Sequence, residues 1–444
     1  MSVNVSEVPK LRPAEPPLSE AAAEAWIPRI CFKKGPPDRI GVEVELLVGG
    51  LGPAGLTAHI PGSRYPRLIE ALGGAQLDGL DGRLTVEPGG QVELSSPAGP
   101  NVTATIACVH RDLSRLRRRA RTCGVHLVGL GVDPLRDPRR INDEPRYVAM
   151  ERYFRPWRSA GPAMMCSTAS LQVNVEAITP TVGLADRWEL LHAIGPTLVA
   201  AFANSPCRLG RPTGFKSTRQ AIWHSLDPAR TGVPSQRLGE SPAERWTRWA
   251  LDAPLMLVRR SSGDWSAPRG VTFRDWLRHG RAAVPDHPAP VLDDLAYHLT
   301  TLFPPVRARG HLEIRYVDAQ PGCWWIVPAA VLAALLDDPG TADLARAACE
   351  PVRDRWWEAA RSGMGHPGLN RAAVELLQLA AERFRATRVG GTSAFRDADR
   401  VADRIEGYLE RWTLRGRSPA DDPLDSMAAE RACDEDQTLE EASA

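Results

Sequence analysis

Acidic and apolar side chains alternate in several short stretches of this chain. That is the period of a β-strand, because successive side chains point to opposite faces of a sheet. The clearest stretch is IGVEVELLV, which places Glu43 and Glu45 on one face and the valines between them on the other. The predicted strand regions are Ile40 to Val48, Leu84 to Pro97 with a turn at PGG, Leu171 to Ala177, and His311 to Val317.

If these regions pair in one antiparallel sheet, their apolar faces can pack on helices while polar side chains gather on the other face. An ordinary solvated sheet face is the alternative interpretation. It fits less well because glutamate is a poor strand residue and carboxylates dominate here. The polar face would carry Glu43, Glu45, Glu93, Asn174, Glu313 and Arg315, with Glu87 just before the PGG turn.

Between and after these strand regions lie segments in which apolar residues recur at helical spacing. Together the strands and helices predict an α+β fold, in which an antiparallel sheet is backed by helices. The predicted helices are Thr103 to Cys123, Trp188 to Ala203, Leu292 to Leu302, Pro328 to Leu336, Thr341 to Arg361, Leu369 to Thr387, and Ala394 to Leu414.

The two ends of the chain differ in composition from its middle. Residues 1–29 are rich in Pro and Glu, and we expect a flexible N-terminal arm there. Residues 416–444 are strongly acidic with few large apolar groups, so we expect a disordered tail. Residues 30–415 are predicted to form a single catalytic domain with a helical C-terminal part.

The overall charge and cysteine pattern exclude several classes of protein. The formal net charge of the 444 residues is +1, so neither nucleic acid nor an anionic membrane is indicated. The eight cysteines are scattered without a CxxC pair, which argues against a zinc site or a disulfide framework. No apolar run is long enough to span a bilayer. We therefore expect a soluble cytoplasmic protein with reduced thiols.

Carboxylates gathered on one sheet face repel one another and raise each other's pKa. A stable cluster at neutral pH therefore calls for an added cation. Oxygen ligands without a Cys or His pair favour Mg²⁺ or Mn²⁺, which commonly bridge carboxylates to substrate phosphates. The pattern predicts a site for a divalent cation among the carboxylates of this face.

A long irregular connection, residues 202–232, contributes cationic candidates. Arg219 and Arg230 are suited to hold ATP phosphates or a substrate carboxylate through planar, charge-assisted hydrogen bonds. Lys216 is a further candidate for ATP. Each of them taken singly is more often a surface group. No GxxxxGK[ST] sequence is present, so a P-loop is not indicated.

Five longer motifs occur in the same order as in a known family. The chain closely resembles plant-type glutamate–cysteine ligases, and still more the actinobacterial glutamate–cysteine ligases of ergothioneine biosynthesis, from about residue 38 to 412. The motifs are VEPGGQVELSSP (86–97), MMCSTASLQVNVEA (164–177), FANSPCRLGRPTGF (202–215), IWHSLDPARTG (222–232) and HLTTLFPPVRARGHLEIRYVDAQPGCW (298–324).

The resemblance implies a glutamine-synthetase-like fold, in which the antiparallel sheet forms a funnel. It implies that the metal ligands are Glu43, Glu45, Glu93 and Glu313, and that Glu87 is a further ligand or a substrate contact. Arg315 is implied as a phosphate-binding group, and Arg219 as a residue near glutamate or the transferred phosphoryl group. Asn174 is a candidate substrate contact on the same face.

One position departs from the family. Plant-type enzymes have an arginine where this chain has Ser167. We expect another arginine, Arg146 or Arg152, to take its place in anchoring substrate.

The resemblance implies an ADP-forming ligase that uses ATP, glutamate and cysteine. ATP would phosphorylate the γ-carboxylate of glutamate, and the amine of cysteine would displace phosphate to give γ-glutamylcysteine. Two alternatives stay open: a related ligase with another amine substrate, and a non-catalytic binding protein on the same fold. The candidate acids are all present, which disfavours the second.

Overall fold

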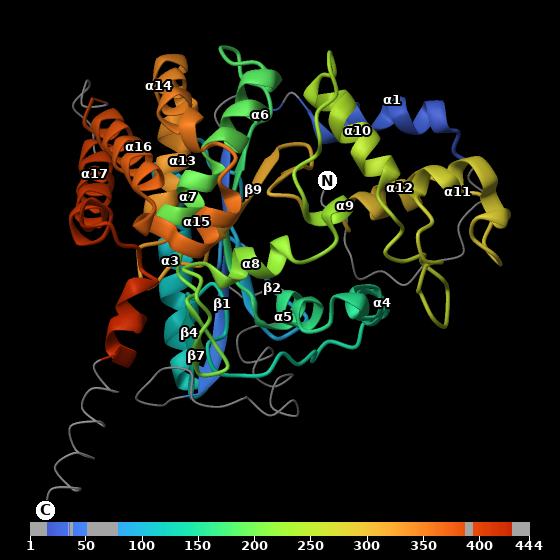
Figure 1. The fold of residues 1–444 in the computed structure, drawn as a ribbon, viewed down its shortest axis with the longest axis horizontal. Helices are drawn as coiled ribbons and strands as arrows, with labels where there is room; N and C mark the ends of the chain where they lie inside the picture. Colours follow the sequence, from blue (N-terminus) through green and yellow to red (C-terminus); the bar gives the residue numbers. More distant parts are fainter. Residues whose placement is uncertain (1–15, 34, 36–38, 51–78, 387–393, 429–444) are drawn as a thin grey trace, which may run out of the picture.

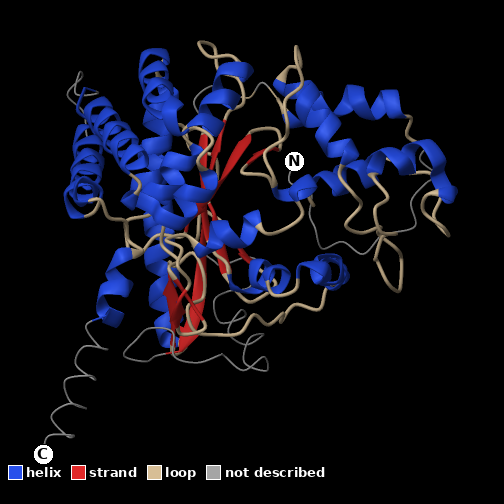
Figure 2. Ribbon diagram, viewed as in Figure 1, coloured by secondary structure: helices blue, strands red, loops and turns tan. Residues whose placement is uncertain are grey.

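A seven-stranded antiparallel sheet runs through the middle of the molecule (Figures 1 and 2). The computed structural model describes residues 16–33, 35, 39–50, 79–386 and 394–428. The strand order is β2-β3-β1-β5-β9-β8, with β4 also paired to β1. The strands are β1 Ile40–Gly50, β2 Arg83–Val86, β3 Val92–Ser95, β4 Val125–Val128, β5 Ser170–Val175, β8 Val306–Ala308 and β9 Leu312–Asp318, and a separate ribbon joins β6 Cys207–Arg208 to β7 Arg211–Pro212.

The strand register brings the predicted polar positions together on one face. Glu45 lies opposite Glu93 on β3, and Asn174 on β5 lies opposite Glu313 on β9. Residues directly opposite in an antiparallel pair share a face. The predicted α+β class and the antiparallel pairing of the four strand regions are therefore confirmed.

One face of the sheet is covered by helices that form the main core. The helix α13 is apolar all round and fully buried from Ile326 to Leu336, as expected for a helix enclosed by others. It contacts α3, α14, α16 and α17 as well as β5 (Figure 1). This layer comprises α3 Val102–Thr122, α7 Gly195–Ala201, α13 Ile326–Asp337, α14 Pro339–Cys349, α15 Trp356–Ser362, α16 Pro367–Ala386 and α17 Ala394–Arg411.

Most of the remaining helices lie on the polar side of the sheet or extend away from it, whereas α6 contacts α7 and α14 of the layer just described. Figure 1 shows α4, α5, α8 and α9 across the sheet from α13 and α16, with α1, α10, α11 and α12 further out. Their bounds are α1 Glu20–Cys31, α4 Pro145–Phe154, α5 Ala160–Ser167, α6 Leu184–Ala193, α8 Thr218–His224, α9 Pro228–Thr231, α10 Pro242–Asp252, α11 Phe273–His279 and α12 Leu292–Leu299.

Two predicted helices are divided in the structure. The predicted helix from Trp188 to Ala203 is α6 followed by α7, and the break precedes Pro196, which has no N–H to continue a helix. The predicted helix from Thr341 to Arg361 is α14 and α15 with a 3₁₀ turn after α14. In the part of the chain that the structure describes, no helix has the length and apolar character that a bilayer crossing needs.

The prediction of a flexible arm over residues 1–29 is wrong for its last ten residues. Residues 20–31 form α1, which is capped by the Ser19 hydroxyl and buries Ala23 and Ile27 completely. The sequence signal was apolar residues at positions 23, 27 and 31, which share one helical face. Residues 1–15 lie outside the described residues.

The prediction of a disordered tail over residues 416–444 is wrong for its first part. Residues 421–428 are helical, and Ser418 and Ala420 are buried. The backbone N–H of Ala420 donates to the Ala203 carbonyl at 3.0 Å. Acidic residues of this segment pair with arginines, so its charge is compensated within the fold. Residues 429–444 lie outside the described residues.

We predict that Ile27→Ala lowers the free energy of unfolding by about 2–5 kcal/mol, because it leaves a cavity where a fully buried side chain packs. The neighbouring exposed Ala25 provides the control, since Ala25→Ser is expected to change stability by less than about 0.5 kcal/mol. Urea unfolding of the full chain measures both. Equal, small effects would mean that α1 does not contribute to the core.

Candidate active site

The predicted acids of the sheet converge on one face. Glu93 is central to them, because its carboxylate is close enough to those of Glu43 and Glu87 for each to affect the pKa of its neighbour. Glu45 interacts electrostatically with both Glu87 and Glu93. These four carboxylates come from β1, β3 and the turn between β2 and β3, and we call them the acid cluster.

Polar side chains of β5 hold two of these carboxylates in place. The Gln172 amide donates to Glu45 Oε1 at 2.8 Å, and the Ser170 backbone N–H donates to Glu45 Oε2 at 2.6 Å. The Asn174 amide donates to Glu43 Oε1 at 2.8 Å. The orientation of both glutamates is therefore set by the strand next to them.

Hydroxyl groups of β2 and β3 do the same for Glu93. The Thr85 hydroxyl donates to Glu93 Oε2 at 2.8 Å, and the Ser95 hydroxyl donates to Glu93 Oε1 at 3.2 Å. Neutral donors orient the acids without removing their charge, so the negative charge of the cluster stays available to a ligand.

The environment of the acid cluster disfavours its charge. Burial, followed by the charges of Glu93 and Glu313, raises the pKa of Glu43 to about 8. Burial and the neighbouring carboxylates likewise raise the pKa of Glu87 and of Glu93 to about 7. Burial also raises the pKa of Glu45, against the opposing charges of nearby arginines. Such a cluster is stabilised by any cation that binds between its oxygens.

The acid cluster has the donor chemistry of a divalent-cation site. All its ligand atoms are carboxylate oxygens, the donors preferred by Mg²⁺ and Mn²⁺, and all four side chains stay partly accessible. Among the described residues, no three of these glutamates have oxygens mutually within 4.8 Å, so carboxylate rotation would accompany binding. Asp81, Cys108 and Asp112 do meet that distance, but Asp112 already accepts from two backbone N–H groups and Asp81 pairs with Arg111.

Glu313 differs from the other predicted metal ligands. It is fully buried, and Arg307 from β8 binds it through two hydrogen bonds, one of them from Nη2 to Oε1 at 2.8 Å. Arg315 Nη1 donates to its other oxygen at 3.1 Å. Burial raises the pKa of Glu313, but Arg307 and then Arg315 outweigh it and hold the pKa well below its usual range. A role of Glu313 in metal binding stays a prediction. In the structure its carboxylate accepts hydrogen bonds from Arg307 and Arg315.

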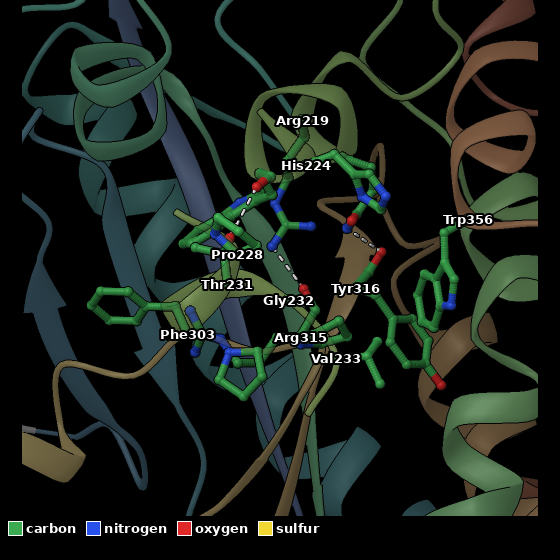
Figure 3. A pocket seen from close by; sticks show the side chains of 14 residues that line it. Arg219, His224, Pro228, Thr231, Gly232, Val233, Phe303, Arg315, Tyr316 and Trp356 are labelled. Carbon is green, nitrogen blue, oxygen red and sulfur yellow. Dashed lines mark hydrogen bonds between the residues drawn. The ribbon is translucent and has the colours of Figure 1, made fainter. Parts of the chain in front are cut away.

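Arg315 connects the acid cluster to a cavity. Its Nη1 also donates to Gln172 Oε1 at 2.6 Å, and its guanidinium centre lies 6.0 Å from the Trp223 ring and 5.8 Å from the Phe303 ring. The cavity holds about 270 Å³ and is mainly apolar (Figure 3). Its walls include Trp223, Phe303, Pro304, Pro305, Tyr316 and Trp356.

Arg219 lies next to Arg315 and bonds to its backbone. Arg219 is 2% exposed and also lines the cavity, and its Nη2 donates to the backbone carbonyl of Arg315 at 2.7 Å (Figure 3). Its Nη1 lies 3.8 Å from Asp318. Burial lowers the pKa of Arg219, although Asp318 and Glu45 oppose that effect. Arg219 therefore holds the backbone of β9 where Arg315 projects.

Two predicted ATP contacts lie elsewhere in the structure. Lys216 pairs with Asp421 at 2.5 Å and so ties down the C-terminal segment. Arg230 is completely buried, donates to the Thr301 carbonyl at 2.6 Å and also to the Pro254 carbonyl. Both cations serve contacts within the protein, and neither lines the cavity. The sequence could not reveal these partners, because they are 24 to 205 positions away.

The two arginines proposed to replace the family's arginine at Ser167 have different surroundings. Arg146 donates to the Thr300 hydroxyl at 2.9 Å, and its charge reaches Glu87. Arg152 is half-exposed and pairs with Asp264 at 2.5 Å. Ser167 itself is buried. Only Arg146 of these two is near the acid cluster.

Sequence reasoning missed two residues of the site. The alternation in LQVNVEA already placed Gln172 beside Asn174, but the search for charged groups passed over an amide. Arg307 lies on a three-residue strand that was not predicted, and a hairpin about Gly310 pairs it with Glu313. The fold and the site together define an α+β enzyme whose acidic sheet face suits cations and anionic ligands.

The comparison with protein families identifies the particular group. The chain belongs to glutamate-cysteine ligase family 2, whose model matches residues 39–440. Glutamate–cysteine ligase EgtA of Mycobacterium tuberculosis is 40% identical over 97% of this chain and 95% of its own length. EgtA of Mycolicibacterium smegmatis is 41% identical over 94% and 93%. A chloroplastic glutamate–cysteine ligase of Medicago truncatula is 34% identical over 54% of this chain and 47% of its own.

We predict that Mg²⁺ stabilises the full-length chain, by about 2.7 kcal/mol when free Mg²⁺ is about a hundred times its dissociation constant. Glu93→Gln is expected to lose most of this effect, while the metal-free variant is at least as stable as wild type because repulsion is reduced. Thermal unfolding with EDTA and with Mg²⁺ measures both. Glu350→Gln, at an exposed position, is the control. An undiminished Mg²⁺ effect in Glu93→Gln would contradict the metal assignment.

Proposed function

We propose that this chain joins the γ-carboxylate of L-glutamate to the amine of L-cysteine, with ATP converted to ADP and phosphate. The product is γ-glutamylcysteine. The observation that carries the proposal is the convergence of four carboxylates from separate sheet elements beside Arg315 and a cavity. The names of the mycobacterial relatives support the choice of substrates.

The first step that the site must assist is phosphoryl transfer to glutamate. The γ-phosphoryl group of ATP passes to the γ-carboxylate, which gives an acyl phosphate and ADP. Catalysis of such a transfer rests on positioning and on offsetting negative charge. Arg315 and Arg219 both line the cavity, and Arg315 also bonds to Gln172 beside the acid cluster, so we assign Arg315 the phosphoryl oxygens. Arg219 positions it from behind.

Divalent ions on Glu43, Glu45 and Glu93 would supply charge neutralisation for the phosphates. The partial accessibility of these side chains supports this assignment, as does the unfavourable charge of the cluster without a cation. We propose Mg²⁺, with Mn²⁺ as the alternative. Glu313 contributes through the arginines that it anchors.

The second step is attack by the cysteine amine on the acyl carbon, which releases phosphate. Glutamate and cysteine must therefore lie side by side on the Arg315 side of the acid cluster. Glu87 and Arg146 are the candidates for amino-acid contacts on this side. Asn174 lies next to Glu43, and its buried Oδ1 has no hydrogen-bond partner among the described residues, so this oxygen is available to a hydrogen-bond donor of the bound substrates.

We further propose that the product enters ergothioneine biosynthesis, the pathway of the ligases that the chain resembles, and that the protein acts in the cytoplasm. All cysteines among the described residues are free, which accords with a reducing compartment.

The direct test is ADP formation by the full chain with Mg·ATP and glutamate, with and without cysteine. We expect turnover to require both amino acids and γ-glutamylcysteine to accumulate in step with ADP. Other amines in place of cysteine address the alternative ligase. Faster ADP formation with a different amine would overturn the assignment of cysteine. If no combination of substrates leads to ADP formation, the assignment of ligase activity is overturned.

We predict that Glu45→Gln or Glu93→Gln lowers kcat at least about a hundredfold, the effect of losing a transition-state contact of roughly 3 kcal/mol. Each change removes one negative charge from the acid cluster while keeping the shape of the side chain. Steady-state ADP release measures it, with Glu350→Gln as the matched control on the surface. A folded variant with wild-type kcat would contradict the role of that glutamate.

A further inference from the structure

The hairpin of β8 and β9 brings several basic residues to one end of the acid cluster. Arg307 lies on β8, the edge strand of the sheet, and Arg309 and His311 lie in the connection to β9. The charge of Arg309 reaches Glu313, Glu43 and Glu93. At the opposite end of the cluster, at Glu45 and Glu87, the nearby cations are instead Arg219, Arg315 and Arg146. The acidic face thus has two ends with different cations.

Arg307 and Arg309 differ in whether their guanidinium groups are already hydrogen-bonded within the protein. Arg307 is buried, and its guanidinium donates hydrogen bonds to Glu313 and to the Leu302 carbonyl. Arg309 is 52% exposed, and its nearest carboxylate oxygen, on Glu313, is 3.7 Å away. Within the described part of the chain its side chain makes no shorter polar contact. Arg309 therefore presents a guanidinium that is open to a ligand.

Arg309 carries its charge close to that of Arg307 on the same hairpin. Three cations, Arg307, Arg309 and Arg315, share the one buried carboxylate of Glu313. An anion that binds beside Arg309 would offset the repulsion between these cations.

The connection is held rigidly by the N-terminal helix. Gly310 has φ +84°, and its N–H donates to the Cys31 carbonyl at the end of α1 at 2.8 Å. The Arg309 N–H donates to the His311 carbonyl at 2.8 Å, which closes the turn. The side chain of Lys33, an exposed residue just after α1, lies against the same turn. The open guanidinium is therefore projected from a fixed backbone.

We propose that Arg309, with Lys33 beside it, binds the polyphosphate chain of the nucleoside triphosphate. This inference rests on the proposed function, because the anion that the reaction brings to the acid cluster is that triphosphate. The nucleotide then approaches along the β8 edge with its terminal phosphoryl group toward Glu43 and Glu93. The amino acids occupy the other end, beside Arg315 and the cavity. This placement takes the part that Lys216 and Arg230 were predicted to play.

The test is equilibrium binding of a non-hydrolysable ATP analogue, inorganic tripolyphosphate and adenosine to the full-length chain with Mg²⁺. Arg309→Gln is expected to weaken the ATP analogue and tripolyphosphate at least about tenfold, the scale of a lost charge-assisted hydrogen bond. Adenosine should change less than about twofold. Arg309→Lys should recover part of the affinity, because it restores the charge without the planar fork.

Arg111→Gln is the matched control, since Arg111 is 55% exposed and pairs with a carboxylate on another part of the surface. It should leave all three affinities unchanged. In turnover, Arg309→Gln should raise the KM for ATP and leave the KM for glutamate and for cysteine within about twofold.

Unchanged polyphosphate binding in a folded Arg309→Gln variant would overturn the inference, and so would an equal loss for adenosine, which indicates a structural effect. These binding results are separable from the proposed function. Wild-type chain that binds ATP but forms no ADP with glutamate and cysteine would refute the ligase reaction alone.

Discussion

Electrostatic repulsion among the sheet glutamates is the constraint on which the site depends. Four carboxylates lie on one partly accessible face, and neutral amides and hydroxyls orient them. A fold can keep such charges close only if it protonates them or receives cations. The helix-covered face supplies the stability for this arrangement, because the apolar residues of the same strands are buried against α13 and its neighbours.

The arginines divide the acidic face into two functional halves. Glu313 is the common anchor, since it receives Arg307 from one side and Arg315 from the other. Because Glu313 is buried, its contribution to the site is to position these two arginines. The Arg315 half adjoins an apolar cavity suited to small organic groups, and the Arg309 half opens toward solvent and suits a highly charged ligand. A reaction between a nucleotide and amino acids needs both environments.

Much of this arrangement could be predicted from the chain itself. Period-two alternation located β1, β3, β5 and β9 and assigned the glutamates to the correct face, because strand geometry is local. Partners of arginines could not be predicted in this way. Arg230 and Lys216 stand in a loop rich in cations, but carbonyls and an aspartate that are distant in sequence occupy them. The helix α1 was not predicted, because the Pro- and Glu-rich composition of residues 1–29 was taken to indicate a flexible arm, although the spacing of Ala23 and Ile27 is helical.

The position of α1 has a consequence for how the molecule assembles. This helix is made early in synthesis, yet it contacts α10 and α11, and its last turn binds Gly310. More than half of the chain must therefore be synthesised before α1 can dock. Contacts of such wide sequence separation form slowly, since a large loop must close first. The basic end of the site should accordingly be among the last parts of a nascent chain to become ordered.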